Sequence, residues 1–202
     1  MNIIRYDEIA EQGRRQVWSS NIADVHRRAM EGLRTYYKND EQTRMFASIA
    51  LGRQLSNVLY SLDGEFCGKT ILDLGCGNRN FVDAGLLFRT RNFEPWLCRG
   101  LQVLGAKPIG VDYNCLDGET FEHYSVDLAD EDCLNMIADH SVDVANASAL
   151  FDSPFLKSYL FLSSRKLKQN IITQLERVLK PEGAFVYDAT GLLTFGMEDG
   201  SF

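Results

Sequence analysis

The sequence contains no apolar run that approaches the roughly 20 residues needed to cross a bilayer. Its first residues, Met1 to Arg5, include no apolar region of the kind found in signal peptides. Basic residues are also scarce, because 21 Lys and Arg stand against 28 Asp and Glu, giving a formal net charge of −7. That charge argues against a broad nucleic-acid-binding surface. We therefore expect a cytoplasmic protein that has neither a membrane nor a nucleic acid as its partner.

Cysteines are few and form no recognisable motif. Cys67, Cys76, Cys98, Cys115 and Cys133 include no Cys-x-x-Cys pair, and none has zinc-ligand spacing to a histidine. Their odd number and scattered positions are typical of reduced thiols in a cytosolic protein. We expect no metal site, and we interpret Cys76, which lies between two glycines, as a small packing residue.

The N-terminal third of the 202-residue chain is predicted to be helical. Residues 21–62 contain almost no helix breakers and indicate two helices, the first capped by Ser20 or Asn21 and the second by Asp40. We expect residues 1–65 to form a helical extension that acts as a lid. Residues 66–202 are then expected to form one α/β domain.

From Thr70 onward, short apolar runs alternate with helical patterns. We expect further strands at 108–112, 121–126, 142–147 and 184–187, and helices at 95–104, 131–138 and 164–179. Such alternation indicates a parallel sheet with right-handed crossovers. The predicted fold class is therefore α/β, with a doubly wound, mostly parallel sheet.

The most informative stretch is Thr70 to Asn78, in which a buried strand runs into a turn with two alternating glycines. Ligands bind at the carboxyl ends of strands in open parallel sheets. Gly75 and Gly77 allow a sharp turn and close approach of a ligand to the backbone. Asp73 adds a negative charge that suits a cationic or amine-bearing ligand and disfavours a dinucleotide pyrophosphate.

Polar residues follow the next strands in the same way. Asp112 ends the second strand, where a carboxylate can accept hydrogen bonds from both ribose hydroxyls, and Tyr113 beside it can pack on an adenine. Asp127 and Leu128 follow the third strand, and Asn146 ends the fourth. Any one of these acids can instead be a turn former, so their ordered recurrence is what points to a ligand site.

Together these segments resemble the class I S-adenosylmethionine (SAM)-dependent methyltransferases, whose first motif reads acid-x-Gly-x-Gly-x-Gly. The resemblance covers roughly Gly68 to Thr190 and implies a Rossmann-like core that binds SAM and methylates a small molecule. It implies that Asp73 and the turn hold the amino-acid end of the cofactor, that Asp127 receives the adenine amino group and that Asn146 lines the methyl end. The implied cofactor-binding residues are Asp73, Gly75, Cys76, Gly77, Asp112, Tyr113, Asp127, Leu128 and Asn146.

Three features depart from the family pattern. Arg79 replaces the third glycine, residues 81–93 look like an insertion, and residues 192–202 leave little room for the family's antiparallel terminal strands. A SAM-binding domain without catalytic activity, serving regulation or interaction, therefore remains an alternative. A nicotinamide-dependent oxidoreductase is disfavoured, because the turn lacks the last glycine of Gly-x-Gly-x-x-Gly. The sequence identifies no general base.

Overall fold

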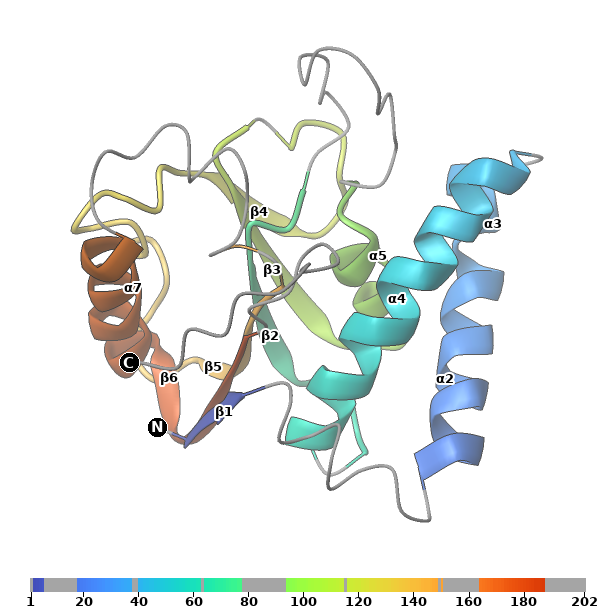
Figure 1. Ribbon diagram of the computed structural model, residues 1–202, viewed down its shortest axis with the longest axis horizontal. Helices are drawn as coiled ribbons and strands as arrows, with labels where there is room; N and C mark the ends of the chain where they lie inside the picture. The colour runs from blue at the N-terminus through green and yellow to red at the C-terminus, as the bar shows by residue number, and fades with distance from the viewer. Residues whose placement is uncertain are drawn as a thin grey trace, which may run out of the picture.

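The computed structural model describes residues 2–5, 18–37, 40–62, 64–77, 94–114, 116–148, 150 and 164–187. They form an α/β fold in which helices cover a six-stranded sheet whose strand pairs are all parallel (Figure 1). Arg79 and the segments 81–93 and 192–202 lie outside these residues. Among the described residues, no helix combines the length and apolarity that a membrane crossing requires.

The order of the strands places the centre of the sheet at the glycine motif. The strands are β1 (Asn2–Arg5), β2 (Thr70–Leu74), β3 (Lys107–Asp112), β4 (Glu122–Ser125), β5 (Val142–Ala147) and β6 (Leu179–Tyr187). Their order is β1-β6-β5-β2-β3-β4. The chain thus runs outward from β2 to β4 and then returns to the other side of β2, which is the Rossmann-like arrangement with a switch point between β2 and β5. The predicted parallel sheet is confirmed.

The helices divide between the two faces of the sheet. They are α2 (Trp18–Gly32), α3 (Arg34–Tyr37), α4 (Glu41–Ser61), α5 (Trp96–Val103) and α7 (Ser164–Val178). On one face, Leu51 of α4 and Trp96 of α5 share a buried apolar core with Ile71 of β2. On the other face, Leu175 of α7 packs in a core with Leu72. Since successive side chains of a strand point to opposite faces, the apolar run of β2 is buried on both.

The predicted N-terminal extension is only partly helical. Its first described residues form β1, which pairs with β6 at the edge of the sheet. The apolar part of β1 is only two residues long, which is too short to signal a strand in the sequence. Helices α4 and α5 pack against one face of the sheet, and α2 packs on their outer side. Their predicted role as a lid over the carboxyl edge stays a prediction.

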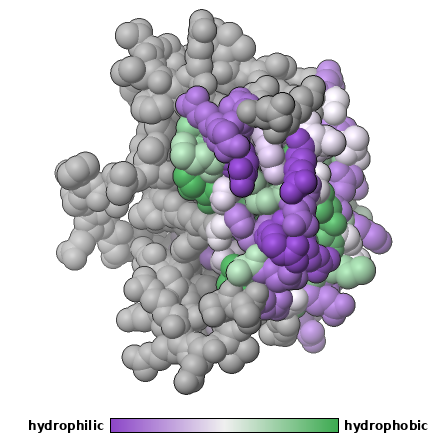
Figure 2. All heavy atoms as spheres, turned by 90° about the vertical axis from the view of Figure 1, so that its right-hand side faces the viewer, coloured by the Kyte–Doolittle hydropathy of each residue, from purple (hydrophilic) through white to green (hydrophobic). Residues whose placement is uncertain are grey.

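The outer surface of these helices is mostly hydrophilic. Figure 2 shows this face of the molecule, where charged and polar side chains predominate over scattered apolar ones. On α2, Arg27 forms ion pairs with Asp24 and Glu31 at helical spacing. Such exposed pairs contribute little stability but keep this face solvated.

Several predicted boundaries were right and others were wrong. The side chain of Asp40 accepts hydrogen bonds from the Gln42 and Thr43 N–H groups and caps α4 as predicted. The predicted caps of the first helix were wrong, because α2 already begins at Trp18.

Residues 131–136, predicted as part of a helix, form successive turns instead. Hydrogen bonds such as that from the Asn135 N–H to the Asp132 carbonyl span three residues rather than four. The buried side chains of Cys133, Leu134 and Ile137 suit either conformation, so their spacing could not separate a helix from turns.

Strand β6 begins five residues before the predicted start at Ala184, because a register shift opposite Val142 and Val144 accommodates the extra residues. Leu179 pairs with Val142, and Ala184 already pairs with Val144. Residues 180–183, between Leu179 and Ala184, lie outside the strand that the sequence predicts at 184–187.

Candidate functional site

The candidate site lies where the order of the strands reverses. In the sheet, Asp73 of β2 stands opposite Asn146 of β5 on one side and Gly110 of β3 on the other. Neighbouring parallel strands end at the same edge, so the turn after β2 lies beside the end of β3. The structure thus brings together the turn, Asp73, Asp112 and Asn146.

The glycine turn is held to the end of β3 by its own N–H groups. The Gly75 and Cys76 N–H groups both donate to the Val111 carbonyl, at 2.7 and 3.2 Å. The Gly77 N–H donates to Oδ2 of Asp112 at 3.0 Å. Three successive N–H groups of the turn therefore already have acceptors within the protein.

Gly75 makes the sharp turn that the sequence predicted. Its φ of +69° lies in the left-handed region that disfavours other residues. A Cβ at this position would lie only 2.9 Å from Cδ1 of Leu150. The residue therefore serves the turn and also the packing of Leu150, and its predicted role in the close approach of a ligand stays a prediction. Gly77, with φ of +89°, also adopts the left-handed conformation.

Asp73 is buried beneath the turn and is only 3% exposed. Its Oδ1 accepts a hydrogen bond from Asn146 Nδ2 at 2.7 Å, and Cys98 Sγ of α5 lies 3.7 Å from its Oδ2. Burial raises the pKa of Asp73 to about 7, and nearby Asp112 adds to this, although both hydrogen bonds oppose it. Asp73 thus positions Asn146 and Cys98, and its carboxylate is not exposed to an amine in solution.

Asp112 is half-buried and joins two segments of the site. One carboxylate oxygen accepts the bond from Gly77, and the other accepts from the backbone and side-chain amides of Asn114. The same residue's carbonyl accepts from the Val126 N–H at the end of β4. This carboxylate therefore fixes the turn after β2 relative to the connection that follows β3.

The remaining predicted residues lie around this centre. Tyr113 is 51% exposed, next to Asp112, so its ring is accessible to a flat ligand. Oδ1 of Asp127 accepts a hydrogen bond from the Ala129 N–H at 2.9 Å, as a turn former does. The side chain of Leu128 is buried in the apolar core on the α7 face. Cys76 is buried and contacts the apolar cluster of Cys98, Leu116 and Phe121.

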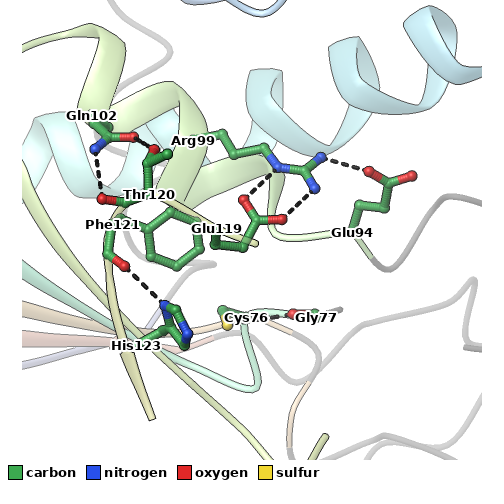
Figure 3. A network of polar contacts seen from close by, with 9 residues as sticks. All are labelled: Cys76, Gly77, Glu94, Arg99, Gln102, Glu119, Thr120, Phe121 and His123. Carbon is green, nitrogen blue, oxygen red and sulfur yellow. Dashed lines mark hydrogen bonds and ion pairs between the residues drawn. The ribbon is translucent and has the colours of Figure 1, made fainter. Parts of the chain in front are cut away.

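Sequence reasoning missed a buried ion cluster beside the site (Figure 3). The side chain of Arg99 donates two hydrogen bonds to Glu119 and one to Glu94, and its guanidinium lies over the rings of Tyr36 and Trp96. Burial alone would lower the pKa of Arg99, but the two carboxylates outweigh burial, so its pKa is raised. The available signal was a charged residue within the apolar run of α5.

This cluster anchors the surroundings of the site. Glu119 belongs to the connection between β3 and β4, which also carries Tyr113, and Glu94 immediately precedes the buried start of α5. Arg99 therefore ties that connection to α5, and through the ring of Tyr36 also to α3.

Comparison with known proteins gives no family assignment. No model of a protein family matches the chain, and no curated protein matches it. Within the described ranges, no group of three or more His, Cys, Asp or Glu side chains could hold a metal ion.

Proposed function

We propose that this protein is a SAM-dependent methyltransferase that acts on a small-molecule acceptor. The observation that carries the proposal is the bond from the Gly77 N–H to Asp112, which joins the glycine turn after β2 to an acid at the end of β3. Both groups lie at the carboxyl edge of the sheet, next to the switch point, where open α/β sheets bind ligands. This constellation combines a backbone turn for one end of an adenosyl cofactor with a carboxylate for its ribose.

The described residues fit such a cofactor with one change from the sequence-based assignment. Asp112, at the carboxyl end of β3, is the proposed acceptor for the ribose hydroxyls, and the exposed ring of Tyr113 is the proposed surface for the adenine. Asp73 is proposed to act indirectly, because it is buried and holds Asn146 near the end of β5. Asp127 and the backbone of Leu128 remain the proposed contacts for the adenine edge.

The chemistry asks mainly for alignment. The bound cofactor supplies an activated methyl group on a sulfonium, so the protein has to orient the acceptor and exclude water. Asn146 is the described polar side chain closest in register to Asp73 on the neighbouring strand, and it is itself buried. Asp73 has a pKa of about 7, but it is buried beneath the turn, and the proposal assigns it no role as a general base.

The turn also argues against a nicotinamide dinucleotide. Such cofactors place their pyrophosphate on the free N–H groups of a glycine-rich turn. Here the N–H groups of Gly75, Cys76 and Gly77 donate to protein acceptors, and one of those acceptors is a carboxylate. A pyrophosphate would have to displace these bonds and lie next to Asp112.

Calorimetric titration of the full chain with SAM, S-adenosylhomocysteine and NAD tests the proposal. We expect micromolar dissociation constants for the two adenosyl ligands, which correspond to a binding free energy of about −8 kcal/mol. We expect no measurable binding of NAD. Asp112→Ala should weaken binding by about 1.5–3 kcal/mol, roughly 10- to 150-fold, because a charged acceptor is lost. Asp112→Asn keeps an acceptor for the Gly77 N–H and so separates loss of charge from loss of the turn.

Asp132→Ala, which removes an exposed acid from the turns after β4, is the matched control and should bind like the parent. Absence of heat with both adenosyl ligands at millimolar concentration would overturn the proposal. Binding without transfer of a labelled methyl group to any small-molecule acceptor in a mixed pool would favour the SAM-binding domain without catalytic activity.

A further inference from the structure

Two cysteines from different elements meet beneath the glycine turn. Cys76 belongs to the turn itself, and Cys98 lies on α5. An ideal Cβ built on Gly110 would lie 3.0 Å from Sγ of Cys76 and 3.4 Å from Sγ of Cys98. Both sulfur atoms therefore lie close to the same point of β3, and each thiol affects the pKa of the other.

Gly110 makes this arrangement possible. Its φ is not among the positive values of the described glycines, so its backbone conformation does not demand glycine. The same ideal Cβ would also lie 2.7 Å from Cε2 of Phe121. The missing side chain thus leaves the space next to Gly110 into which both thiols project, within a cluster that also contains Phe121 and Leu116.

We propose that Cys76 and Cys98 are an oxidative modification site, at which hydrogen peroxide converts the two thiols into one disulfide. Of the two, Cys76 is the residue that a small oxidant reaches, because it is 8% exposed while Cys98 is fully buried. Cys98 serves as the second thiol. This assigns a reactive role to Cys76, which the sequence alone suggested to be a packing residue.

The reaction is balanced with one molecule of peroxide. The deprotonated sulfur of Cys76 attacks one peroxide oxygen, the O–O bond breaks, and the departing hydroxide takes up the proton that the thiol released. The sulfur of Cys98 then attacks the Cys76 sulfenic acid, so that the S–S bond forms and the S–O bond breaks. The proton of Cys98 leaves with the hydroxide as a second water. The two thiols lose two electrons, and the peroxide gains them.

The surroundings set the rate and provide a proton acceptor. The neighbouring thiol of Cys98 lowers the pKa of Cys76, but burial and the carboxylates Asp73 and Asp112 outweigh it, so the pKa is raised. Burial raises the pKa of Cys98 as well, and its thiol faces Oδ2 of Asp73 at 3.7 Å. We therefore expect oxidation that is slower than that of an exposed thiol such as Cys67, with Asp73 first taking the proton of Cys98 and then passing it to the departing hydroxide.

The disulfide would tie the turn to α5 and remove the S–H donor of Cys98 from Asp73. For its effect on ligands the inference rests on the proposed function, whereas the disulfide itself does not. Because the same turn is fixed to Asp112 through Gly77, we expect the oxidised protein to bind SAM at least tenfold more weakly than the reduced protein.

The test treats the full chain with hydrogen peroxide, blocks remaining thiols after denaturation, and maps the peptides by mass spectrometry. We expect a peptide pair linked through Cys76 and Cys98, 2 Da lighter than the two reduced peptides and separated again by dithiothreitol. Recovery of both cysteines as blocked thiols while Cys67 is oxidised would overturn the proposal, as would pairing of either with another cysteine. This mapping needs no variant.

Variants and ligand titration then separate the two proposals. Cys98→Ser and Cys98→Ala should form no link and should keep SAM binding after treatment, while Cys67→Ser should behave like the parent. Loss of binding in treated Cys98 variants would show that the disulfide is not the cause. If the reduced parent does not bind SAM at all, the proposed function fails, and the mapped link still decides the modification site.

Discussion

Two aspartates on the same sheet lie in opposite electrostatic settings. Asp143, near the amino end of β5, accepts hydrogen bonds from Nζ of Lys180 at 2.8 Å and from the Thr70 N–H at 2.9 Å. Burial would raise its pKa, but these partners outweigh the burial and lower it. Asp73, toward the carboxyl end of β2, has only the neutral donors Asn146 and Cys98, and its pKa is raised to about 7.

The missing cation at Asp73 does not come from a lack of cations nearby. Arg99 directly follows Cys98 on α5, yet its guanidinium is held by Glu94 and Glu119. Within the described part of the chain, no Lys or Arg forms an ion pair with Asp73. A buried acid without a cation costs stability, and such perturbed acids are typical of functional sites. The amino end of the sheet thus carries a structural carboxylate, and the carboxyl end carries one that suits a site.

The largest effect is expected at Arg99, whose guanidinium pairs with Glu94 and Glu119 and not with Asp73. Arg99→Met leaves two mostly buried carboxylates uncompensated and should lower the free energy of unfolding by about 3–5 kcal/mol, measured by urea denaturation at pH 7. Arg99→Lys keeps one charge without the paired hydrogen bonds and should lose less. A loss below about 1 kcal/mol in Arg99→Met would show that the cation does not hold this cluster together.

The second prediction concerns the pH dependence that Asp73 confers. The unfolded acid loses its proton near pH 3.8, and the native one keeps it until about pH 7. The native state therefore binds more protons between these values, and stability falls as the pH rises. Between pH 5 and pH 8 this amounts to a loss of about 3 kcal/mol, which Asp73→Asn should abolish.

Urea denaturation of the parent and Asp73→Asn across that range measures the difference. Asp132→Asn, at an exposed acid, is the control and should keep the slope of the parent. Equal slopes in the parent and in Asp73→Asn would mean that Asp73 is ionised in the native state, and the contrast with Asp143 would disappear.

Asp73 and Asp112 show what the sequence could and could not predict about the site. The apolar runs that end in Asp73 and Asp112 predict strands, and the rule that parallel strands end at one edge brings these acids together. The contact of Asp73 with Cys98 depends on how α5 crosses the sheet, which local periodicity does not contain. For this reason Cys98 and Arg99 were missed, and Asp73 was expected to face a ligand when it is in fact buried.

Two glycines at opposite ends of β2 separate backbone strain from packing. Gly75 and Gly68 both have positive φ, +69° and +72°, but only Gly75 has a neighbour that a Cβ would meet at 2.9 Å. Gly68→Ala should therefore cost about 1 kcal/mol from strain alone, and Gly75→Ala about 2 kcal/mol or more. Thermal or urea unfolding measures both, and the adenosyl ligands should bind more weakly only to Gly75→Ala. If the two variants lost equal amounts of stability, Leu150 would accommodate the added Cβ freely. If they also lost equal amounts of ligand affinity, the turn would not be part of the site.

The smallest effect is expected at the amino end of the sheet. Lys180 is 43% exposed, so solvent screens its pair with Asp143, and Lys180→Met should cost about 0.5–1 kcal/mol at pH 7. Because the native pKa of Asp143 is lowered, its stabilising contribution is complete above the unfolded value of 3.8 and disappears as the pH falls through the native one. The parent and Lys180→Met should therefore converge in stability under acid, which is the reverse of the trend that Asp73 produces.

Lys107→Met, at the amino end of β3 on the other side of β2, controls for the loss of an exposed charge. A difference between Lys180→Met and the parent that persists at pH 2.5 would show that Lys180 stabilises the sheet through its alkyl chain rather than through Asp143.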